Sequence, residues 1–205
     1  MTRDPLNMRL LPANHTGKYD FPTIARYDGE IPSELIPFNY ARSYPDRKVG
    51  VHFFIDDYQF ERLWRFPDRY IPLLQEYDCV LTPDFSIYVD MPLTLKIYNV
   101  YRNRVLGHYW QQNGINVIPT LQWADYRSFD FCFSGIEPCG IVAVSTLGSA
   151  QNPQSRGYWI AGMKQAIDKL QPTTVLLYGT PIDFDFGNIM VIHYENIVLN
   201  RLRNR

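Results

Sequence analysis

Short apolar runs recur along the chain from residue 49 onward, separated by polar loops and by longer segments with helical spacing. Apolar runs of about four to eight residues, bounded by turn residues, are typical of strands that are buried on both faces. Most successive runs begin about 25 to 35 residues apart, which leaves room for the crossover that joins parallel strands. The pattern therefore predicts strands over Val49–Ile55, Cys79–Thr82, Ile115–Pro119, Gly140–Ser145, Thr173–Tyr178 and Ile189–His193.

The longest segment with helical spacing follows Asp90 and ends near Gln112. An acidic residue followed by a proline is typical of a helix start, and Asn113–Gly114 is typical of a helix end. The stripe of this helix that is predicted to face the core consists of Leu93, Ile97, Tyr101, Val105 and Tyr109. The polar face of the helix carries arginines and asparagines and is predicted either to be exposed or to bind a ligand.

These elements predict an α/β fold. Right-handed crossovers between parallel strands give either an open twisted sheet or a barrel. The predicted strands are too few for a closed barrel of eight strands. We therefore predict a mostly parallel sheet of five or six strands with helices on both faces, and a partial (β/α) barrel is the alternative.

Residues 1–46 follow a different pattern, with neither helical nor strand spacing. Prolines at high density block regular backbone hydrogen bonding. Tyrosines and phenylalanines alternate with these prolines, and burial of aromatic rings is strongly favourable. We therefore predict an extended proline- and aromatic-rich arm that packs on a single α/β domain formed by residues 47–205. An arm that binds a partner is the alternative.

Composition and charge narrow the class of protein. A net charge of −1 provides no general positive field, which argues against a nucleic acid partner. The basic tail with Arg201, Arg203 and Arg205 is interpreted as a solvated end, and contact with nucleic acid is the alternative. Three cysteines without a CxxC pair indicate a reducing, cytoplasmic location. The chain starts without the apolar run of a signal peptide and contains no long apolar segment, so no contact with a membrane is predicted.

Carboxylates follow several predicted strands: Asp56 and Asp57 the first, Asp84 the second, and Asp125 the third. Parallel α/β proteins place their chemistry at the carboxyl ends of strands. We therefore predict that Asp84 and Asp125 are catalytic, either as a general acid–base pair or as ligands of Mg²⁺, the candidate cofactor. The alternative is structural, because Asp57 and Asp90 are good helix caps and Asp84 can cap a turn.

Five further residues are predicted to bind a ligand. Arg102 has a fork of donors that suits phosphate or carboxylate. Ser145 and Thr146 lie between a predicted strand and a predicted helix start, where backbone N–H groups bind anions. Trp123 and Tyr178 offer aromatic faces to a ring. The loop lacks the Walker and dinucleotide motifs, and a loop closed by an asparagine helix cap is the alternative.

The chain resembles a known family in several segments: Asp84–Pro92, Ile97–Arg104, Ile118–Asp125, Phe131–Ile136 and Val144–Thr146. Together they are similar to a family of bacterial and phage proteins known only as a domain of unknown function. The resemblance covers roughly residues 49–194. It implies a setting in phages, prophages and mobile genetic elements, and it implies no activity or cofactor.

Two functions follow as hypotheses. In the first, a phage or mobile-element protein processes a phosphorylated or nucleotide-type small molecule, with carboxylates at the carboxyl ends of strands. In the second, the protein is a non-catalytic binder that captures a nucleotide or a host protein, for example to counter a host defence. Whether the protein is an enzyme is left open by the sequence.

Overall fold

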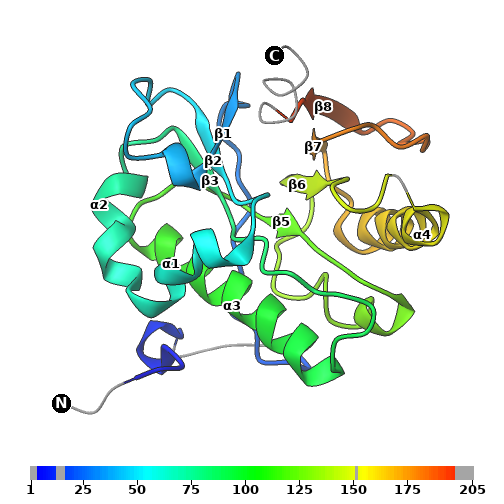
Figure 1. Cartoon of the computed structure of the whole chain (residues 1–205), viewed down its shortest axis with the longest axis horizontal. Coiled ribbons are helices and arrows are strands. Elements are labelled where there is room, and N and C mark those ends of the chain that lie inside the picture. Colours follow the sequence, from blue (N-terminus) through cyan, green and yellow to red (C-terminus); the bar gives the residue numbers. More distant parts are fainter. Residues whose placement is uncertain (1–3, 13–16, 151, 197–205) are drawn as a thin grey trace.

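The computed structural model describes residues 4–12, 17–150 and 152–196, and two parallel sheets of four strands form its centre (Figure 1). The sheets have the orders β1-β2-β3-β4 and β5-β6-β7-β8. All six predicted strands are present, so the α/β class and the parallel pairing are confirmed. The strands are β1 (Leu35–Pro37), β2 (Gly50–His52), β3 (Cys79–Leu81), β4 (Val117–Ile118), β5 (Thr120–Leu121), β6 (Ile141–Ser145), β7 (Thr174–Tyr178) and β8 (Met190–Tyr194).

Two strands were not predicted, and they change the sheet. β1 comes from the proline-rich segment and pairs in parallel with β2. β5 follows β4 after Pro119 alone. Ile118 pairs with β3, whereas Thr120 pairs with β6. Because proline lacks the N–H group of a sheet ladder, the pairing changes partner at this residue, and the predicted single sheet of five or six strands is instead two sheets of four.

The two sheets enclose a common core, to which no described helix residue belongs. The hydroxyl of Tyr194 donates to the carbonyl of Pro32 at 2.5 Å and so links the last strand to the segment that precedes β1. Side chains from the two sheets therefore pack against each other on the inner side of the strands, where no helix lies. The prediction of helices on both faces of the sheet is wrong. The arrangement corresponds to the partial barrel. The inner core consists of Tyr27, Leu35, Phe54, Cys79, Leu81, Ile118, Ile141, Ala143, Leu176, Tyr178 and Tyr194.

The helices lie outside the strands (Figure 1). α1 (Glu61–Arg65), α2 (Ile71–Leu74) and α3 (Leu93–Gln112) share a buried apolar cluster with the first sheet, and α4 (Pro153–Leu170) shares another with the second. No helix in the described part of the chain is both long enough and apolar enough to cross a membrane. The short 3₁₀ segments are η1 (Met8–Leu10), η2 (Phe38–Tyr40), η3 (Asp57–Gln59), η4 (Pro67–Tyr70) and η5 (Tyr126–Ser128).

Helix α3 has the predicted length but not the predicted orientation. Val105 is buried as expected, whereas Leu93 is 43% exposed. The polar face is turned inward, because the segment after β3 has no strand partner and its backbone is hydrogen-bonded by side chains of this helix. The buried polar residues of α3 are Lys96, Asn99, Arg102, Asn103 and Arg104.

The predicted caps at Asp57 and Asp90 are wrong. Asp57 is the first residue of η3, and its carboxylate accepts hydrogen bonds from the backbone and the hydroxyl of Ser86. The N-cap residue of α3 is Pro92, which forms no side-chain cap bond. The basic tail lies outside the described residues.

Candidate functional site

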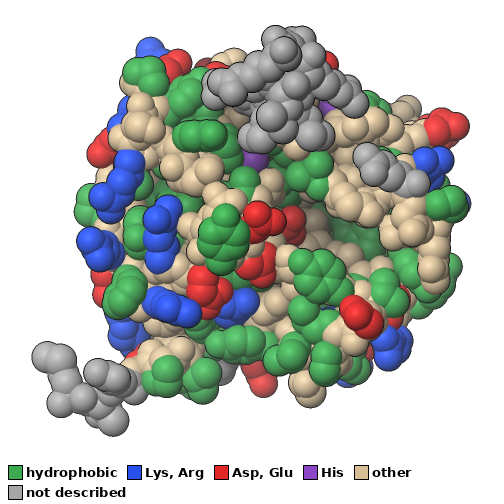
Figure 2. All heavy atoms as spheres, viewed as in Figure 1, with side chains coloured by type: hydrophobic (Ala, Val, Ile, Leu, Met, Phe, Trp, Pro, Cys, Tyr) green, Lys and Arg blue, Asp and Glu red, His purple; other side chains and the backbone are tan. Residues whose placement is uncertain are grey.

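A cavity of about 300 Å³ opens at the carboxyl ends of β3, β5 and β6. Its walls consist of residues 84, 86–89, 121–124, 144–145 and 147–149 together with the start of α4. Figure 2 shows that acidic side chains gather beside a hollow on this face of the molecule. The cavity therefore lies where a parallel α/β fold is expected to carry its site.

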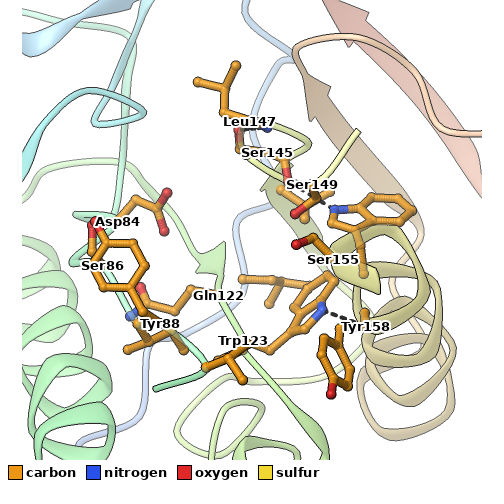
Figure 3. Close-up of a pocket in the computed structure, with 17 residues that line it drawn as sticks. Asp84, Ser86, Tyr88, Gln122, Trp123, Ser145, Leu147, Ser149, Ser155 and Tyr158 are labelled. Atoms are coloured by element: carbon orange, nitrogen blue, oxygen red, sulfur yellow. Dashed lines mark hydrogen bonds between the residues drawn. The ribbon is translucent and has the colours of Figure 1, made fainter. Parts of the chain in front are cut away.

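Asp84 is partly buried, and its carboxyl group points into the cavity (Figure 3). Burial raises the pKa of Asp84 to about 7, and the nearby carboxylate of Asp57 adds to this rise. A carboxyl group with such a pKa is present in both protonation states at neutral pH. Asp84 can therefore either accept or donate a proton.

Trp123 and Ser145, which were also predicted, line the same cavity. The indole N–H of Trp123 donates to the carbonyl of Tyr158 at 3.0 Å, which fixes the ring at the cavity wall. The hydroxyl of Ser145 accepts from the backbone N–H of Leu147 at 3.0 Å and keeps its own proton for donation. The structure therefore brings Asp84, Trp123 and Ser145 to one site.

Sequence reasoning missed several polar residues of the cavity. Figure 3 shows Ser149 and Ser155 on the side of α4, across the cavity from Asp84. Gln122 directly precedes the predicted Trp123, whereas Ser155 and Tyr158 lie on α4, where no site residue was predicted. Proximity to a strand end was the only available signal. Serine and tyrosine are common in loops, so their type alone indicates no chemistry. The missed residues are Ser86, Tyr88, Gln122, Ser149, Ser155 and Tyr158.

Asp125 is buried and does not line the cavity. Its Oδ2 atom lies 3.3 Å from Nζ of Lys96 and 2.7 Å from Nη2 of Arg127. Burial by itself would raise the pKa of Asp125, but the hydrogen bonds from Arg127 and Lys96 outweigh it and lower the pKa. Asp125 is thus held as a carboxylate in an ion-pair network, and its catalytic role stays a prediction.

The other three predicted residues do not line the cavity. Arg102 donates to both carboxylate oxygens of Glu61, at 3.1 and 2.8 Å, and its guanidinium lies 3.8 Å from the ring centre of Phe85. Thr146 donates to the backbone carbonyl of Tyr178 at 3.3 Å. The ring of Tyr178 packs in the inner core. Each of the three side chains thus has contacts within the protein, whereas the buried Nε atom of Arg102 has no hydrogen-bond partner among the described residues. Ligand binding by these residues stays a prediction.

The start of α4 is closed by its own cap. The Oδ1 atom of Asn152 accepts from the N–H groups of Gln154 and Ser155, at 2.9 and 3.1 Å. The N–H of Arg156 donates to the carbonyl of Asn152, and Pro153 has no N–H. The donors that were predicted to bind an anion are therefore already used within the helix start.

Asn152→Ala should lower the free energy of unfolding by about 1 kcal/mol, because it removes the acceptor of two backbone N–H groups. Urea denaturation measures this loss. Gln154→Ala in the same exposed turn is the control and should leave the stability unchanged. An unchanged stability of Asn152→Ala would contradict the capping role.

The described residues contain no group of three or more His, Cys, Asp or Glu that could hold a metal. The carboxylate of Asp57 is near enough to that of Asp84 to raise its pKa. Both oxygens of Asp57, however, accept hydrogen bonds from Ser86. Mg²⁺ binding therefore stays a prediction.

A family model described as "Domain of unknown function (DUF4417)" matches residues 13–195. The "Gene 1 protein" of Mycobacterium phage D29 and that of Mycobacterium phage L5 are each 38% identical to the chain over 179 residues, or 86% of its length. The match covers 66% of the D29 protein, just under two-thirds, and 77% of the L5 protein. No solved structure matches the chain.

The phage relatives support a phage origin and confirm the predicted resemblance to an uncharacterised phage family. The family match extends over the sheets, the helices and the cavity described above. The chain therefore belongs to the DUF4417 family, whose domain has no known function.

Proposed function

We propose that the protein is an enzyme that transfers protons to or from a small polar molecule of the nucleoside type, with Asp84 as the general acid–base. The observation that carries this proposal is the carboxyl group of Asp84, which faces the cavity and has a pKa of about 7. A catalytic pKa near the working pH favours both directions of proton transfer. Asp84 would activate a water molecule or a hydroxyl of the ligand, or protonate a leaving group.

The polarity of the cavity supports a ligand with a ring and several hydrogen-bonding groups. Hydroxyl and amide side chains, such as Ser149 and Gln122, alternate with the aromatic rings of Trp123 and Tyr158. The volume of about 300 Å³ suits a base or a nucleoside. Aromatic faces stack on such rings, and the hydroxyl groups suit a sugar.

The charge of the cavity does not favour a polyanion inside it. Asp84 is the only charged residue among the described residues that line the cavity. The nearby cations have other partners, since Arg127 pairs with Asp125 and Arg156 donates to the carbonyl of Ala150. Phosphate groups of a nucleotide would therefore lie outside the cavity, with the base and sugar inside.

A thermal-shift series with bases, nucleosides, nucleoside monophosphates and nucleoside triphosphates tests the ligand class. A ligand that binds only the native state raises the melting temperature. We expect nucleosides to raise it at least as much as their triphosphates, and inorganic phosphate to have no effect. Stabilisation by phosphate or triphosphates alone would overturn this ligand class. Compounds that stabilise the protein are then assayed for conversion by chromatography.

A further inference from the structure

The segment that carries Asp84 is held by side chains instead of a strand partner. It leaves β3 and lines the cavity before it reaches α3. Four of its backbone carbonyls, those of Pro83, Phe85, Ser86 and Val89, accept hydrogen bonds from side chains. The position of this segment therefore depends on the side chains that provide those donors.

Two amide side chains hold the residues on either side of Asp84. Nδ2 of Asn103 donates to the carbonyl of Pro83 at 2.8 Å, and Nε2 of Gln122 donates to the carbonyl of Phe85 at 2.9 Å. Nδ2 of Asn103 also donates to Oε1 of Gln122 at 3.1 Å, so that the two amides are joined. Both side chains are buried.

Arg104 orients the amide of Asn103. Its Nη1 atom donates to Oδ1 of Asn103 at 2.5 Å, while Nε and Nη2 donate to the carbonyls of Ser134 and Cys132, at 2.9 and 2.5 Å. A guanidinium can only donate, so Asn103 must turn its oxygen toward Arg104 and its NH₂ group toward Pro83. Arg104 has no exposed surface, and burying an arginine and an asparagine is costly unless their polar atoms are hydrogen-bonded.

From this geometry we infer that Asn103, oriented by Arg104, forms with Gln122 an amide clamp that positions Asp84 in the cavity. Asn103 does not line the cavity, so it is a positioning residue. An apolar residue in its place would leave the buried carbonyl of Pro83 without this donor. The importance of the clamp for catalysis rests on the proposed function, whereas its effect on the position of Asp84 does not.

Titration of the Asp84 carboxyl carbon by ¹³C NMR tests the clamp without any substrate. In the wild-type protein we expect a midpoint near pH 7, because the carboxyl is held in a desolvated place. Asn103→Leu should move the midpoint toward the ordinary aspartate value of 3.8, since a released segment lets the carboxyl reach water. Val105→Ala on the same helix is the control, because it removes buried apolar volume without touching the clamp.

Gln122→Met is the second variant, and it decides the matter if Asn103→Leu does not fold. It removes the bond to Phe85 and the bond from Asn103 to Oε1 of Gln122, but keeps the bonds of Asn103 to Pro83 and Arg104. We expect a smaller shift of the Asp84 midpoint in the same direction. A midpoint in the folded variants equal to that of Val105→Ala would overturn the clamp. If the Asp84 midpoint moves as expected but the wild-type protein converts no ligand, only the proposed function is overturned.

Discussion

Asp84→Asn should reduce turnover by at least about a hundredfold, the usual contribution of a positioned general acid or base. Asparagine preserves the size of the side chain but cannot exchange a proton. Ligand affinity should change far less, because Trp123 and the hydroxyl groups of the cavity remain. Turnover and affinity are measured separately, by product formation and by calorimetry, with a compound that stabilises the protein in the thermal-shift series.

The control for this variant is Asp90→Asn. Asp90 lies in the same connection before α3, is exposed and does not line the cavity. It should retain full turnover. If Asp84→Asn binds and converts the ligand as well as Asp90→Asn does, Asp84 is not the general acid–base. A wild-type protein that binds the ligand but never converts it would support the non-catalytic binder instead.

The pH dependence of stability provides a second test of Asp84. Its folded-state pKa of about 7 lies above the ordinary value of 3.8, so the native state holds a proton that the unfolded chain has already released. Stability should therefore fall as the pH rises between these values, by on the order of 2 kcal/mol after allowance for partial exposure. Asp84→Asn should remove this part of the fall, which urea denaturation at pH 5 and pH 8 measures.

The sequence predicted the strands well where their side chains are continuously apolar. β6 and β7 are buried along almost their whole length, and their apolar runs stand out in the sequence. β1 was missed because it has only three residues, ends at Pro37 and forms only by pairing with β2. The change of partner at Pro119 depends on contacts between distant segments. Local patterns cannot show these contacts.

The orientation of α3 could not be predicted from amphipathicity, because its buried face is polar. Arg102 was a reasonable ligand-binding candidate, but it pairs with Glu61, a residue of α1. Only the tertiary structure shows which acceptor a buried arginine contacts. The rule that strands carry function at their carboxyl ends did locate Asp84, Trp123 and Ser145, since that rule depends on topology alone.

Asp125→Ala should lower the free energy of unfolding by about 3 kcal/mol, because it leaves the ammonium group of Lys96 buried without its carboxylate. The Lys96 side chain has no exposed surface, and that of Asp125 is 9% exposed. The other partner, Arg127, is 63% exposed and is well solvated without Asp125. Most of the loss should therefore arise from Lys96, and urea denaturation at pH 7 measures it.

The double variant Lys96→Met with Asp125→Leu should be within about 1 kcal/mol of the wild type, because both buried charges are replaced by apolar groups. The carbonyl of Val89 then keeps Arg127 as its donor, at 3.2 Å. The pKa of Asp125 is lowered in the folded protein, so the stability that its carboxylate contributes is lost as the pH falls through that pKa. The double variant has no carboxylate at this position and should not lose stability for this reason at low pH. If the double variant is stable and retains turnover, Asp125 is not catalytic and its role is to pair with the buried Lys96. If it is stable but inactive, the predicted catalytic role of Asp125 is supported.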